Sequence, residues 1–199
     1  AVNPSPKESD MFHRFCLLSF ICLFLSVELL AAPLTPAQVG DALAGRSPQL
    51  LSTLADRDKS LKSYSEAVLK YWDSYEAKIG GPMRAWAAKV LSHVPKETIF
   101  YPFGGPDFVT VHRLYPKAGR YVLMGLEPSG RLPDLRTMPL HRFRSLLNLL
   151  RESTRKFSRT GFFVTRTMLD QFKKRSSALE GVATLLVLFA AHEGFEVLS

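Results

Sequence analysis

Cysteine is almost absent from this sequence of 199 residues, in which only Cys16 and Cys22 occur. Both lie in an N-terminal segment that we expect to be removed, for reasons given below. The remaining chain would then contain no thiol. This absence excludes disulfide bonds, thiolate metal ligands and a cysteine nucleophile, so stability must come from the hydrophobic core.

The sequence patterns of common metal and nucleotide sites are also missing. His93, His112 and His141 show no spacing typical of metal ligands, and His192-Glu193 lacks the second histidine that a zinc-protease helix carries one turn later. No G-x-S-x-G surrounds a serine, and no G-x-G-x-x-G is present. We therefore predict neither a metal nor a cofactor.

Apolar runs of the length that crosses a bilayer are absent too. The runs at residues 15–27 and 181–191 are both shorter than the roughly 20 residues that a spanning helix needs. The second of these is apolar nearly all round, which is typical of a helix buried in a core. We therefore expect no transmembrane span in the mature chain.

The first apolar run instead has the order of a secretory signal peptide. It follows Met11 and Arg14 and leads to the small residues Ala31 and Ala32. We expect residues 1–10 to be an upstream tail and residues 11–32 to contain a signal peptide, cleaved at Ala31 or Ala32, with the bond after Ala31 favoured. The mature protein would then be exported to the periplasm or the outside of the cell. A retained anchor is the alternative.

Acidic residues are scarce in one stretch of the chain, where the basic excess is concentrated. The net charge of the sequence is +8, and the segment from Arg131 to Arg175 holds twelve Lys or Arg residues against three acidic ones. Within it, Leu140, Phe143, Leu147 and their successors form one apolar face of a predicted amphipathic helix that Pro139 opens. The rest of that helix is basic. It could contact anionic lipid or polysaccharide of the envelope. The residues concerned are Arg142, Arg144, Arg151, Arg155 and Lys156.

A plainer interpretation of the same helix is core packing with a solvated basic face. Nucleic acid is not an expected partner, because the mature chain is predicted to work outside the cell.

The segment from residue 33 to 95 is predicted to be helical. Thr35-Pro36 and Ser47-Pro48 each pair a capping residue with proline at the first helical position. Apolar and aromatic residues recur at helical spacing over 59–79, and Gly80-Gly81 is expected to end that helix before Pro82 starts the next.

From residue 96 onward the pattern changes to strands. Residues 98–103 and 120–126 resemble buried strands, a glycine turn and a helix lie between them, and such a βαβ unit implies parallel pairing. A further helix is expected to end at Gly194 and a further strand to begin at Phe195. We predict one α/β domain over 33–199, with N-terminal helices and a largely parallel, three-layer, Rossmann-like sheet. We also expect it to be truncated at its C-terminus.

Ligands of open α/β sheets bind at the carboxyl ends of the strands, which directs attention to the two turns that follow the predicted strands. Asp107 and Glu127 are the candidate catalytic pair, since neighbouring carboxylates can serve as acid and base. Asp107 could instead simply start a helix, and Glu127 could simply pair with Arg131. The candidate ligand-binding residues are Gly104, Gly105, Ser129 and Arg131.

The same turns carry a resemblance. The segments YPFGGPDF (101–108) and GLEPSG (125–130) resemble the motifs Y-P-F-[SG]-G-P-D-F and G-L-E-P-x-G of a family of uncharacterised bacterial exported proteins. The resemblance covers roughly residues 60–199, and its members are usually longer, which agrees with truncation. It implies export but no activity, substrate or catalytic residue.

Three functions therefore remain open, and the sequence does not decide whether the chain is an enzyme. The first is binding or hydrolysis of an envelope or small-molecule ligand at the strand-end turns. The second is a non-catalytic, envelope-associated protein that uses the basic helix. The third is a methyltransferase-like or nucleotide-binding enzyme, suggested by the spacing of the βαβ unit.

Overall fold

The computed structural model describes residues 33–94, 97–103, 107–125, 128–162, 179 and 181–198. Its first helix, α2 (Pro36–Leu43), begins at the predicted cap: Thr35 Oγ1 accepts a hydrogen bond from the Gln38 amide, and Gln38 Oε1 accepts one from the Thr35 amide. The predicted start at Ser47-Pro48 is wrong. Short turns follow instead of a helix. One of them is closed by the hydrogen bond from the Leu50 amide to the Ser47 carbonyl, at 3.2 Å.

The expected helix end at Gly80-Gly81 is also wrong. Helix α3 (Ala55–Tyr75) continues through a π-helical turn, η1 (Glu76–Gly80), into α4 (Gly81–Val90). Both glycines have right-handed helical φ angles, −64° and −61°. Only glycine fits at these two positions, because neighbouring atoms of the helix are close. A Cβ on Gly81 would lie 2.8 Å from the Glu76 carbonyl oxygen. A π turn is one residue wider than an α turn, and such turns recur at functional or tightly packed places.

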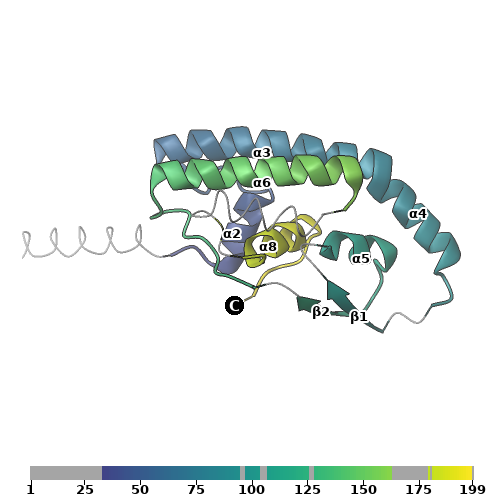
Figure 1. Ribbon diagram of the computed structural model, residues 1–199. Helices are drawn as coiled ribbons and strands as arrows, with labels where there is room; N and C mark the ends of the chain where they lie inside the picture. Colours follow the sequence, from purple (N-terminus) through teal and green to yellow (C-terminus); the bar gives the residue numbers. More distant parts are fainter. Residues whose placement is uncertain are drawn as a thin grey trace, which may run out of the picture. The chain divides into compact units, whose positions relative to one another are not determined.

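Helices α3 and α6 (Leu140–Thr160) lie side by side and run in the same direction (Figure 1). The predicted apolar face of α6 is confirmed, since Phe143, Leu147, Leu150 and Phe157 are all buried. On α3, Trp72 is buried with its ring 5.7 Å from that of Phe157. This edge-on aromatic packing lies at the centre of the core.

The βαβ unit is confirmed. Strands β1 (Thr98–Phe103) and β2 (Arg120–Gly125) pair in parallel, and α5 (Phe108–Leu114) connects them. Side chains alternate between the two faces of the sheet. The prediction of buried strands is wrong for one face, which is open in the described part of the chain: Phe100 is 62% exposed and Met124 47%.

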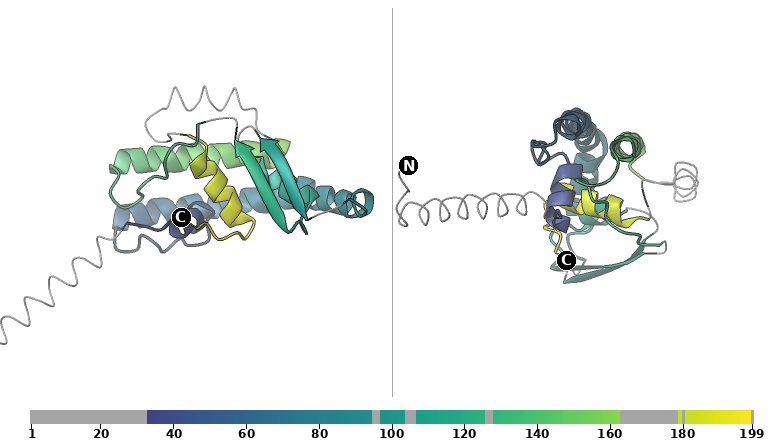
Figure 2. Two further views of the ribbon diagram at one scale, coloured as in Figure 1. Left: turned by 90° about the horizontal axis from the view of Figure 1, so that it is seen from below. Right: turned by 90° about the vertical axis from the view of Figure 1, so that its left-hand side faces the viewer.

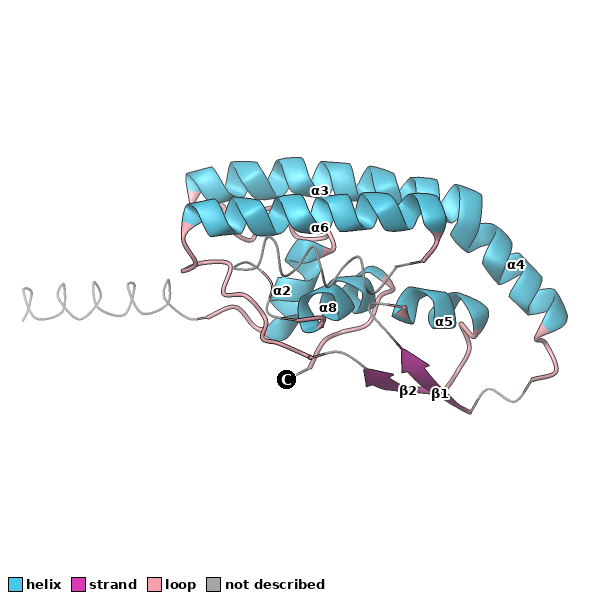
Figure 3. Ribbon diagram, in the orientation of Figure 1, coloured by secondary structure: helices cyan, strands magenta, loops and turns pink. Residues whose placement is uncertain are grey.

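Helix α8 (Ala183–His192) lies between the α3–α6 pair and the sheet, next to α2 and α5 (Figure 2). The elements of Leu34–Ser199 cluster as one unit, mixed in helix and strand, with helices predominating (Figure 3). Gly194, at φ +88°, follows α8 as predicted. Residues 195–198, predicted as a strand, form none. Among the described residues no helix has the length and apolar character to cross a membrane.

Candidate functional site

The carboxyl ends of β1 and β2 meet at one edge of the sheet. The strands pair in register from Thr98 with Arg120 to Phe103 with Gly125, so both following turns leave from the same edge. Of the predicted site residues, Gly104, Gly105 and Glu127 lie outside the described residues. The proposed pairing of Asp107 with Glu127 therefore stays a prediction. Asp107, Ser129 and Arg131 are described, as follows.

Asp107 occupies the position before the first residue of α5, as expected for a residue that starts a helix, but its side chain does not cap that helix. Its carboxylate instead lies near Tyr101 of β1. Burial, and secondarily the negative charge of Asp107, raise the pKa of the Tyr101 hydroxyl. Tyr101 was not predicted as a site residue. Its position two residues before the strand end, on the helix-covered face with Ile99, is the signal that could have identified it.

The turn after β2 is held by the start of α8. The Pro128 carbonyl accepts a hydrogen bond from the Val182 amide at 3.2 Å, and the Ser129 carbonyl accepts one from the Ala183 amide at 2.8 Å. These bonds satisfy amide groups that a helix start leaves without partners. The Ser129 and Arg131 side chains are exposed. The backbone of this turn is therefore fixed while its side chains face solvent.

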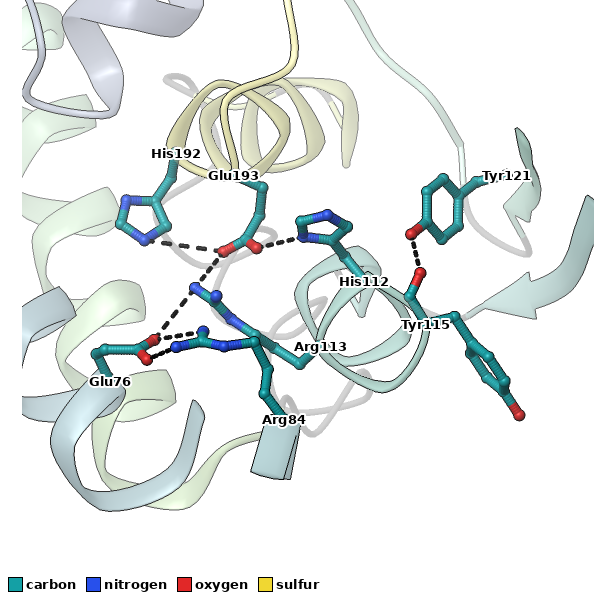
Figure 4. A network of polar contacts seen from close by, with 8 residues as sticks. All are labelled: Glu76, Arg84, His112, Arg113, Tyr115, Tyr121, His192 and Glu193. Atoms are coloured by element: carbon teal, nitrogen blue, oxygen red, sulfur yellow. Dashed lines mark hydrogen bonds and ion pairs between the residues drawn. The ribbon is translucent and has the colours of Figure 1, made fainter. Parts of the chain in front are cut away.

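A polar network that the sequence analysis did not predict joins η1, α4, α5 and the end of α8 (Figure 4). Glu193 is at its centre, with its side chain only 1% exposed. The Arg113 guanidinium donates to Glu193 at 2.7 Å, and His112 Nδ1 lies 2.5 Å from the other carboxylate oxygen. Arg113 also reaches Glu76 at 3.4 Å, and Arg84 donates two hydrogen bonds to Glu76.

The network alters the protonation of its members. The hydrogen bond from Arg84 lowers the pKa of the Glu76 carboxyl, and burial raises the pKa of the nearby Tyr75 hydroxyl to about 12. Burial also lowers the pKa of His192 to about 4, against a partial opposing effect of Glu193. The His192 ring stacks on Trp72, with centroids 3.7 Å apart. His192 is therefore neutral in the folded protein near pH 7.

These contacts favour a structural role over a catalytic one. The oxygens of Glu193 are occupied by Arg113 and His112, and the carboxylate is shielded from solvent. The five ionisable residues Glu76, Arg84, His112, Arg113 and Glu193 line neither of the hollows described below, although Tyr121, also drawn in Figure 4, lines one of them. Within the described ranges, no group of three or more His, Cys, Asp or Glu residues gathers as a metal site. The network instead joins the C-terminal end of α5 to η1 and to the end of α8.

The neutral state of His192 predicts a pH dependence. The unfolded chain protonates this histidine near pH 6.5 and the folded protein only near pH 4, so stability falls as pH drops through that interval. Between pH 7.5 and pH 5 the parent should lose about 2 kcal/mol of unfolding free energy through this histidine. The His192→Phe variant, which keeps a ring against Trp72, should not show this loss. Urea unfolding at both pH values measures this. An equal loss in both proteins would contradict it, and His141→Phe, at an exposed position, is the control.

Among the hollows of the described surface, one of about 390 Å³ is mostly apolar. It lies beside β2 from Arg120 to Leu123 and reaches Phe108, the first residue of α5. Its larger side chains are Phe108, Tyr121, Leu123, Leu186, Val187 and Phe195.

The second hollow, also of about 390 Å³, is polar and lies between α3 and α6. Arg144 and Arg151, two of the residues predicted to contact an anionic surface, line it. Of the others, Arg155 is paired with Glu152 at 2.7 Å, Lys156 is exposed, and Arg142 is only partly exposed. The predicted basic residues of α6 are therefore not equivalent.

Comparison with known proteins assigns no family or function to the chain. No protein-family model matches the chain, and no curated protein and no solved structure is significantly similar to it.

Proposed function

We propose that this chain is an exported α/β domain that binds an envelope or small-molecule ligand at the carboxyl edge of β1 and β2. One observation carries the proposal: the two strands are parallel, adjacent and in register, and both end at that edge. In open α/β sheets this edge is where ligands bind. Export is supported by the order of residues 11–32, and the three-layer, Rossmann-like sheet is a further part of the proposal.

Each predicted residue has a role in this proposal. Gly104 and Gly105 would let the ligand approach the backbone, and Ser129 and Arg131 would contact it with exposed side chains. Asp107 and Glu127 would serve as general acid and base if the ligand is hydrolysed. The electrostatic effect of Asp107 on Tyr101, two residues from the end of β1, supports a polar site near this edge.

A fragment screen followed by amide NMR shifts tests the site even while the ligand is unidentified. We expect polar fragments to shift the amides of Asp107, Ser129 and Arg131, and Asp107→Asn to weaken those shifts. Asp73→Asn, at an exposed position of α3, is the matched control and should leave them unchanged. Fragments that shift only the amides around Leu186 and Val187, in the apolar hollow, would refute the proposed site.

A second candidate function is favoured by the arrangement of α6. We propose that its basic face attaches the protein to anionic lipid or polysaccharide without catalysis, through Arg142, Arg144, Arg151, Arg155 and Lys156. The observation in its favour is that Arg144 and Arg151 face one hollow instead of pointing to different sides. Its test is the vesicle measurement described in the next subsection.

A further inference from the structure

The polar hollow between α3 and α6 has the composition of an anion site. Residues three and four apart share a helix face, so Asp56, Lys59 and Ser63 of α3 line one wall. Arg144 and Arg151, seven residues apart, project from the same side of α6, two turns from each other. Asn148 lies between them on that side. Two parallel helices thus bring three cationic side chains to one concave surface.

The charges around this hollow are not balanced. Lys59, Arg144 and Arg151 provide three positive charges, and Asp56 provides the one negative charge among the lining residues. Asp56 and Arg144 are only loosely paired, at 3.8 Å, and the Asp56 side chain is 76% exposed. The hollow therefore carries a net charge of about +2.

Several donors in the hollow are available to a ligand. Among the described residues, no hydrogen bond or ion pair is formed by the side chains of Lys59, Asn148 or Arg151. By contrast, the Tyr64 hydroxyl at the buried end of the hollow donates to the Leu43 carbonyl at 2.7 Å and is already satisfied. The donors that remain come from both helices and converge on one space.

We propose that this hollow binds a phosphoryl group carrying about two negative charges. A phosphate monoester carries a charge of about −1.5 to −2 at neutral pH, which matches the local excess. Arginine presents a planar fork that fits phosphate oxygens, and lysine adds a compact charge on the opposite wall. The inference deepens the second candidate function and rests on it, because it assigns anion binding to one pocket instead of the whole basic face.

Titration with sodium glycerol 2-phosphate, a phosphate monoester, at low ionic strength tests the pocket. We expect it to raise the melting temperature of the full chain in a dose-dependent way, and less so at high salt, where exposed charges are screened. The double variant Arg144→Gln/Arg151→Gln should weaken binding at least about tenfold, since two charge-assisted contacts are lost. The matched control Lys70→Gln/Arg159→Gln removes one exposed charge from each of the same two helices, away from the hollow, and should bind as the parent does.

Two results would overturn the pocket. One is the absence of binding at low salt, which removes the second candidate function as well if anionic vesicles also fail to bind. The other is an equal loss of binding affinity in both double variants. That result would indicate a diffuse basic face and would reject a specific site.

Vesicles with and without phosphatidic acid, whose headgroup is a phosphate monoester, distinguish the source of the phosphoryl group. Co-sedimentation with the anionic vesicles that depends on Arg144 and Arg151, and that glycerol 2-phosphate competes away, supports a lipid headgroup in the pocket. Binding of glycerol 2-phosphate without binding of vesicles supports a soluble phosphorylated ligand in the same pocket.

Discussion

The Glu193→Gln variant is expected to lose about 3 kcal/mol of unfolding free energy. The substitution keeps the size of the side chain and one acceptor oxygen but removes the negative charge, which leaves the charge of Arg113 without its compensation at 2.7 Å in a shielded place. Removal of one member of a buried ion pair typically costs about 3 to 5 kcal/mol. We expect the lower end of this range, because Glu76 remains 3.4 Å from Arg113. Urea unfolding at neutral pH measures the difference.

Glu152→Gln is the matched control for that variant. Glu152 also pairs with an arginine at 2.7 Å, but both side chains are more than a third exposed. Exposed pairs contribute about 0 to 1 kcal/mol, so this variant should differ little from the parent. Similar losses in the two variants would show that burial gives the Glu193 network no special contribution to stability.

Gly181→Ala is expected to have the second largest effect, a loss of about 3 kcal/mol. A Cβ at this position would lie 2.4 Å from the Pro128 carbonyl oxygen and 2.6 Å from the Gly130 amide nitrogen. These are backbone atoms, which cannot rotate away as a side chain can. The turn would have to separate from the start of α8, with loss of the bonds to Val182 and Ala183. Thermal unfolding and the amide shifts of Ser129 and Gly130 report both effects.

Gly194→Ala separates this clash from the general effect of replacing a glycine. Gly194 has φ +88°, but no atom lies within 4 Å of its added Cβ. Its cost is therefore backbone strain alone, about 1 to 2 kcal/mol. If Gly181→Ala cost no more than Gly194→Ala, the close approach of the turn to α8 would not be significant for stability.

Local patterns predicted several elements because their causes are local. The capping box at Thr35 needs only residues three apart, and the apolar face of α6 needs only helical spacing. Parallel pairing of β1 and β2 followed from the length of the connection between them, which a hairpin would not require. In the candidate site, the common edge of the two turns was predictable for the same reason.

Other features could not be read from local patterns. Gly80-Gly81 has the composition of a helix end, yet the helix continues through it. The two positions are glycine because Tyr75 and Glu76 pack where a Cβ would be. Glu193 stands out in the sequence only as part of an incomplete metal motif. Its partners His112 and Arg113 are 81 and 80 residues away in the chain, and no spacing rule connects them.

The amino-acid sequence alone determined the start of α2, the apolar face of α6 and the parallel pairing of β1 with β2, since capping, helical spacing and connection length act over short distances. Only the tertiary structure decided which charges are paired. It buried Glu193 between α5 and α8 and left Lys59 and Arg151 with available donors between α3 and α6. Burial and pairing depend on residues that are distant in the chain but adjacent in space, and these set the energy of a charge.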